Sequence, residues 1–133
     1  MATRQLIKHD SLRQTDFYHH VCVSEGRRMV HFAGQVAFDR DRNLQGGDSL
    51  EAQMRFAFQN LQTALGAGGA VLEDLVMMTF YVVGYQEQHR DVLMDVMGEF
   101  LPPEQRPPST LLGVQALAYP ELLIEIDGMA VID

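Results

Sequence analysis

The segment that most constrains the fold is the apolar run LVMMTFYVV at residues 75–83. It contains no charged residue, glycine or proline, and it is far shorter than the roughly 20 residues that a membrane-spanning helix needs. Because both faces of the run are apolar, it predicts a strand that is covered on each side. A chain built around such a strand needs further elements to cover it.

One amphipathic helix is predicted before this strand in the sequence, and another is predicted after it. The first begins at Asp48, an expected N-cap, with Glu51 placed to complete a capping box. Its apolar residues follow helical spacing: Leu50, Met54, Ala57, Phe58, Leu61 and Leu65. Gly66, Gly68 and Gly69 are expected to end it. The second helix has its apolar stripe between residues 92 and 101 and is stopped by Pro102 and Pro103.

The remaining strands are predicted from alternation and turn signals. They are His19–Val23 and Met29–Val36, paired as a hairpin, then Thr110–Leu117 and Leu122–Ile132, with a short strand near Gln5–Lys8. This order predicts an α+β domain with two helices on one face of a mixed sheet. The uncovered face must meet water or another subunit, and closed cyclic assembly is the usual solution.

Composition narrows the classes of function. The 133 residues, 47% of them hydrophobic, predict one globular domain spanning residues 1–133. The single cysteine, Cys22, and the absence of an apolar core in the first ten residues predict a cytoplasmic protein without a membrane anchor. A formal net charge of −8 argues against nucleic acid as the main partner.

No cofactor or metal site is expected from the histidines or the cysteine. His19 and His20 are adjacent, so on a strand they point to opposite faces and cannot share one ion. Cys22 has apolar neighbours and is interpreted as a buried packing residue.

Several short motifs occur together in an order that resembles the YjgF/RidA family of reactive-intermediate deaminases. They are Phe32–Gln35, Gly47-Asp48, Gln59–Gly69, Asp74–Val76, Arg106–Thr110 and Leu123–Gly128. The resemblance implies a chorismate-mutase-like fold, a homotrimer and a small-molecule cleft at each subunit interface. It also implies hydrolysis of enamines and imines, such as 2-aminoacrylate, to a keto acid and ammonia.

The resemblance also implies roles for individual residues. Glu125 matches the family's water-orienting glutamate, Tyr18 matches an aromatic residue of the cleft, and the Thr110 backbone N–H matches a donor to the substrate carboxylate. Gly34 would allow a ligand close to the backbone. On a strand Glu125 and Asp127 share a face about 7 Å apart, although both carboxylates could instead face solvent or pair with cations, and Tyr18 could be a packing residue.

Pro108 occupies the position where deaminating relatives carry an arginine. Loss of one charged hydrogen bond would weaken carboxylate binding by roughly ten- to a hundredfold. Arg106, on the same side of an extended chain, or Arg90, at the start of the second helix, could supply the missing charge, although either could equally be a surface arginine.

Three functional interpretations stay open. The chain could be a divergent imine or enamine deaminase, a trimer that binds a small carboxylate-containing metabolite without converting it, or an RNA-cleaving or translation-inhibiting protein. The net charge of −8 disfavours the third.

Overall fold

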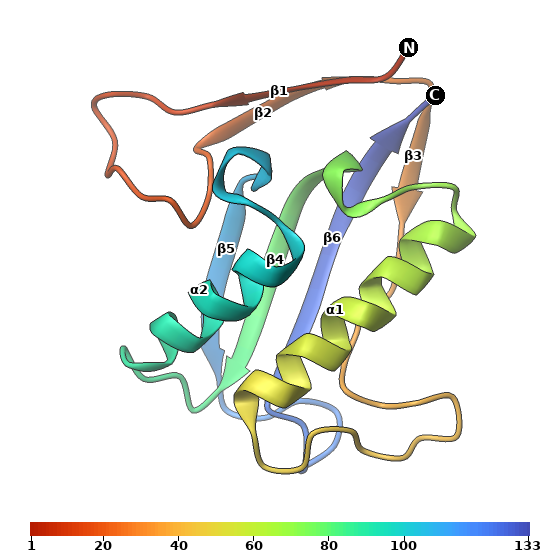
Figure 1. Ribbon diagram of the computed structural model, residues 1–133, viewed down its shortest axis with the longest axis vertical. Coiled ribbons are helices and arrows are strands. Elements are labelled where there is room, and N and C mark those ends of the chain that lie inside the picture. Colours follow the sequence, from red (N-terminus) through yellow and green to blue (C-terminus); the bar gives the residue numbers. More distant parts are fainter.

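The computed structural model describes residues 1–133 and is organised around a mixed four-stranded sheet (Figure 1). The strand order is β3-β6-β4-β5, formed by β3 (Arg28–His31), β6 (Ile124–Ile132), β4 (Leu75–Val83) and β5 (Ser109–Val114). β4 pairs antiparallel with β6 and parallel with β5. The predicted central strand is confirmed with its boundaries unchanged, but the prediction that it is covered on each side is wrong, because one of its faces is left uncovered.

Two helices cover one face of this sheet (Figure 1). They are α1 (Leu50–Ala67) and α2 (His89–Phe100), and neither is long and apolar enough to cross a membrane. Their inward residues join alternate residues of β4 and β6 in a core of 20 buried side chains. Phe58 of α1 stacks on Phe100 of α2 with ring centroids 4.7 Å apart, which packs the two helices against each other.

Capping residues and glycine define the two ends of α1, and the N-cap differs from the prediction. Ser49, and not Asp48, is the N-cap of α1, because its side chain accepts a hydrogen bond from the Ala52 N–H at 3.1 Å. Glu51 pairs instead with Arg55 at 3.2 Å. After the helix, Gly69 has a φ of +83°, a conformation that suits glycine and turns the chain toward η1 (Leu72–Asp74).

The N-terminal residues form a separate two-stranded ribbon. β1 (Thr3–Ile7) pairs antiparallel with β2 (Val21–Glu25), whereas β3 pairs with β6. The predicted hairpin between residues 19–23 and 29–36 is therefore wrong. Arg4 fastens the ribbon to the rest of the fold, since its guanidinium donates to the Leu75 carbonyl at 2.5 Å and to the Gln105 side chain at 2.8 Å.

Several predicted strands are shorter in the structure. The segment expected to be a strand over residues 29–36 is regular only in β3, and Gln35 then makes an isolated bridge to Ile126 of β6. β5 ends at Val114 and β6 starts at Ile124. Cys22 is only partly buried, which differs from the buried position expected for it.

The second face of the four-stranded sheet is not covered by a helix. Apolar side chains are exposed there, with Met29 at 58%, Met77 at 47% and Leu112 at 44% exposure. Polar side chains of β4 and β6 occupy the rest of the same face, because Thr79 is paired with Asp127 and Tyr81 with Glu125. This uncovered face carries the carboxylates that the sequence singled out.

Candidate functional site

Glu125 lies on the uncovered face of the sheet, directly against Gly34. A Cβ atom added at Gly34 would lie 2.9 Å from Cδ and 3.0 Å from Cγ of Glu125, so only glycine leaves room for this carboxylate. Two backbone hydrogen bonds hold the segment in place. The Gln35 N–H donates to the Ile126 carbonyl at 2.8 Å, and the Ile126 N–H donates to the Gln35 carbonyl at 3.0 Å. The structure thus brings together two of the predicted site residues, Gly34 and Glu125.

The Glu125 carboxylate is flanked by a second acid. Burial, followed by the neighbouring charge of Asp127, raises the pKa of Glu125 above the ordinary carboxyl range. The Tyr81 hydroxyl donates to Oδ2 of Asp127 at 3.1 Å. Burial and this hydrogen bond raise the pKa of Tyr81, so the phenol stays a neutral donor near neutral pH. Glu125 itself accepts no hydrogen bond within the chain and is free to bind water or a ligand.

We expect Asp127→Asn to lower the pKa of Glu125. Removing the neighbouring negative charge favours the ionised form, so the midpoint of protonation moves to lower pH, whereas burial keeps it above the ordinary range. A carboxyl-carbon NMR titration of Glu125 in the two proteins measures the shift directly. An unchanged or raised midpoint would mean that the two carboxylates do not interact.

Tyr18 and Arg90 line a different part of the molecule. Together with Arg13, Tyr85 and other residues they surround a hollow of about 350 Å³ beside β5. Figure 1 shows the loop between β1 and β2 on the same side of the molecule as β5 and α2. Phe17 anchors this loop, since its ring is buried and lies 5.7 Å from that of Phe80 in the core. Tyr18 is therefore held in a defined position.

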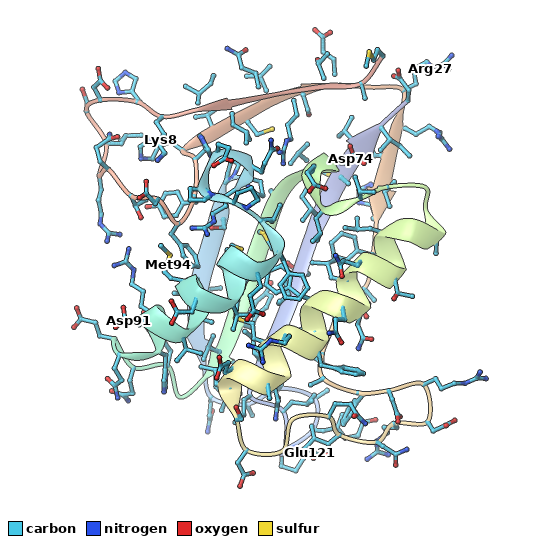
Figure 2. All side chains as sticks on the ribbon, in the orientation of Figure 1. Lys8, Arg27, Asp74, Asp91, Met94 and Glu121 are labelled. Carbon is cyan, nitrogen blue, oxygen red and sulfur yellow. The ribbon has the colours of Figure 1, made fainter.

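Arg106 has a structural role, because its buried side chain binds backbone carbonyls in the interior. Its side chain is 3% exposed, and its guanidinium donates to the carbonyls of Leu101 at 3.0 Å and Asp16 at 2.8 Å. Its own carbonyl is 2.6 Å from Nδ1 of His19. Sulfur of Met94, which Figure 2 labels on α2, lies 4.0 Å from the same guanidinium. Burial lowers the pKa of Arg106, although an arginine stays charged.

These contacts correct the prediction that Arg106 replaces the missing arginine. Its donors are directed at backbone carbonyls in the interior, so we do not assign it to substrate binding. Its guanidinium instead holds the backbone at Asp16, and its own carbonyl contacts the His19 side chain, so Arg106 makes contacts on both sides of Tyr18. Arg90 is the remaining candidate of the two, since its side chain is only partly buried and lines the hollow.

Thr110 lies on β5 with its side chain on the uncovered face. The Pro108 carbonyl accepts a hydrogen bond from the Met78 N–H of β4, and the Val114 carbonyl accepts one from the N–H of Gly84, the residue after β4, each at 3.1 Å. The register between these two bonds is unbroken. Peptide groups alternate in direction along a strand, so the Thr110 N–H points toward β4, whereas those of Ser109 and Leu111 point to the free edge. The outward donors at this edge are therefore the neighbours of Thr110.

The predicted site residues fall into two regions that the sheet separates. Gly34 and Glu125 lie on the uncovered face, whereas Tyr18 and Arg90 surround the hollow on the helix side, where Leu111 packs against the core. Sequence reasoning missed Tyr81, Arg13 and Tyr85. Alternation in β4 could have put Tyr81 on the face of Thr79, but its pairing with Glu125 depends on the sheet register.

Comparisons with known proteins match this arrangement over nearly the whole chain. Residues 9–132 match the family model described as Endoribonuclease L-PSP. A conserved Rid-family protein of unknown function, YyfB from Yersinia pestis, is 33% identical with a TM-score of 0.88, covering 97% of this chain and 98% of that one.

Two further solved structures are similar. Rv2704 from Mycobacterium tuberculosis, described as a member of the YjgF/YER057c/UK114 family, is 26% identical with a TM-score of 0.66 over 98% of this chain and 100% of that one. RidA from an Antarctic Psychrobacter bacterium is 25% identical with a TM-score of 0.69 over 90% and 97% of the two chains. The family match, the two-helix mixed sheet and these relatives together place the chain in the YjgF/RidA family.

Proposed function

We propose that the protein is a divergent imine or enamine deaminase that hydrolyses a small 2-imino acid to a keto acid and ammonia. The observation that supports this most is the Glu125 carboxylate, which is partly buried, has a raised pKa, accepts no hydrogen bond in the chain and lies against Gly34. A raised pKa makes this carboxylate a stronger proton acceptor than an ordinary exposed one.

The chemistry needs one water and one group that moves a proton. Glu125 would orient the water and take its proton as the oxygen bonds to the carbon of the protonated imine, which gives a neutral tetrahedral amino alcohol. The protonated carboxyl would then return that proton to the nitrogen. As the C–N bond breaks and ammonia leaves, the hydroxyl group would give its proton to the Glu125 carboxylate and become the keto oxygen. An enamine substrate would enter the same sequence after its tautomerisation to the imine.

We also propose that the working cleft lies between subunits of a homotrimer. The exposed apolar side chains of the uncovered face, among them Met29 and Met77, favour burial against another copy. The sheet keeps Glu125 apart from Tyr18 within one chain, so a ligand that touches both would need two copies. The outward N–H groups beside Thr110, at the edge strand β5, would then be available to the substrate carboxylate.

Incubating the purified protein with enzymatically generated 2-aminoacrylate and with several larger imino acids tests the proposal. We expect release of keto acid and ammonia in equal amounts, faster than in buffer, for at least one of these compounds. Release no faster than in buffer across the whole set would contradict the proposed activity.

A binding role without turnover is the second candidate, and Pro108 is the observation that favours it. A proline side chain offers no positive charge, and the Pro108 carbonyl is already used by the Met78 N–H. A thermal-shift screen with keto acids separates the two candidates, because a ligand that stabilises the protein and is recovered unchanged supports binding alone.

RNA cleavage is the activity named in the family description, and the net charge of −8 disfavours it here. Tight RNA binding that weakens steeply over a salt series would support that activity instead.

A further inference from the structure

The loop between β1 and β2 projects from the end of the two-stranded ribbon (Figure 1). Its first half, residues 9–14, is called the flap here, and every residue of the flap is exposed. The second half is anchored, because the Phe17 ring is buried and the Arg106 guanidinium donates to the Asp16 carbonyl. With so little buried surface, the flap depends on polar contacts to stay in place.

Both hydrogen bonds that join the flap to the rest of the protein are made by one imidazole ring, that of His20. The His9 N–H donates to Nδ1 of His20 at 3.0 Å, and Nε2 of His20 lies 2.8 Å from the Arg13 carbonyl. The other hydrogen bonds of the flap, such as those of the Gln14 side chain, stay within it. His20 itself comes directly before β2, and its backbone N–H closes the base of the loop by donating to the Ile7 carbonyl at 3.0 Å.

These two contacts determine the protonation state of the His20 ring. A backbone N–H can only donate, so Nδ1 must present a lone pair to His9, and a carbonyl can only accept, so Nε2 must carry the proton that faces Arg13. The ring is therefore the neutral Nε2–H tautomer. A proton added to Nδ1 would place two donors face to face, and the hydrogen bond from the His9 N–H would be lost.

Other charged or titratable groups lie around the His20 ring. They are His9, Asp10 and Arg13 in the flap, Lys8, Asp16, Tyr18 and His19 in the rest of the loop, and Glu87, Arg90 and Arg106 on segments beside the loop. Among ordinary side chains only histidine changes its charge between about pH 8 and pH 5. Nδ1 of His19 already carries a proton toward the Arg106 carbonyl, 2.6 Å away, so protonation of that ring keeps the contact. Nδ1 of His9 accepts from the Ser11 N–H at 3.1 Å, which is a contact within the flap.

We propose that residues 9–14 are a pH-sensitive flap, which the neutral His20 ring holds closed and which loosens when that ring gains a proton. Arg13 belongs to the flap and also lines the hollow beside β5, so loosening withdraws one side chain from the lining of that hollow. The inference is independent of the proposed function, because it concerns the motion of the loop and requires no substrate.

Backbone nitrogen relaxation of the full-length protein, measured by NMR at about pH 8 and about pH 5, tests the flap directly. At the higher pH we expect order parameters of about 0.8 for the flap amides, and ring-nitrogen shifts that identify the neutral Nε2–H tautomer of His20. At the lower pH the flap amides are expected to fall below about 0.6, while the amides of β2 keep their values. Flap order parameters that are equal at the two pH values would overturn the inference.

His20→Asn separates this contact from other effects of acid. The asparagine side-chain oxygen takes the place of Nδ1 and accepts from the His9 N–H, but the amide gains no proton in this range. The flap of this variant is therefore expected to have the same order parameters at both pH values.

Two further histidine variants are the controls. His31→Asn removes a ring on β3 that makes no hydrogen bond, and His9→Asn keeps an acceptor for the Ser11 N–H. Both are expected to loosen at the lower pH as the unaltered protein does. A flap that still loosens in His20→Asn, or one that no longer loosens in His9→Asn, would mean that His20 is not the group that controls it.

Discussion

Glu125→Gln is expected to lower kcat/KM for imine hydrolysis by at least about a hundredfold. Glutamine keeps the size of the side chain but cannot take a proton from water at any pH of interest. The substitution removes no hydrogen bond within the chain, since the carboxylate accepts none, so the fold should be retained. Keto-acid release measured at equal protomer concentration gives the ratio.

Two further variants sharpen this result. Glu121→Gln makes the same change in an exposed loop ahead of β6, where Figure 2 labels the residue, and is expected to leave activity unchanged. Gly34→Ala is expected to lower activity because the added methyl group collides with the Glu125 carboxylate. The mass of the assembly in solution should be the same for all three. Full activity of Glu125→Gln in a protein of unchanged mass would remove Glu125 from the mechanism.

Arg106→Leu is expected to reduce the free energy of unfolding by about 2–4 kcal/mol. Leucine fills much of the same volume, but the carbonyls of Leu101 and Asp16 lose the hydrogen-bond donors of the buried guanidinium. The segment carrying Tyr18 should also loosen at Asp16, because the Asp16 carbonyl loses its bond to the guanidinium, whereas the contact of His19 with the carbonyl of residue 106 is kept. Urea unfolding at one fixed protein concentration measures the loss.

The matched comparison is Arg40→Gln, which changes an exposed arginine and is expected to alter stability by less than about 0.5 kcal/mol. Arg106→Lys should fall between the two, since an ammonium group can reach one carbonyl but cannot span both as the guanidinium does. If Arg106→Leu is as stable as Arg40→Gln, the interior role of this guanidinium is wrong.

The elements predicted best are those that their own local sequence pattern is sufficient to identify. The strand at 75–83 is recognised from its own apolar residues without knowledge of its partners, although only its helix-covered face is buried and Met77 on the other face is 47% exposed. The start of α1 was misjudged by one residue because Asp48 and Ser49 are both good N-caps, and only the observed hydrogen bond from Ala52 decides between them.

The wrong predictions concern partners that are distant in sequence. The turn-forming residues 24–27 predict a change of chain direction, but they do not determine whether β2 pairs with β3 or β1, and in the structure it pairs with β1. The role of Arg106 could not be predicted either, because arginine is usually a surface residue and one of its acceptors, the Asp16 carbonyl, lies 90 residues away in sequence. The hollow of Arg13 and Arg90 likewise joins two segments that the sequence keeps far apart.

The place of β6 in the sheet has a consequence for synthesis. β6 is the last strand of the chain, yet it lies between β3 and β4, and β3 has no other neighbour in its sheet. While residues 124–132 are still inside the ribosome, β3 and β4 cannot be joined through β6. The edge of the apolar β4 that pairs with β6 then stays unpaired. Premature termination only a few codons before the end would therefore yield an aggregation-prone product rather than a slightly shortened protein.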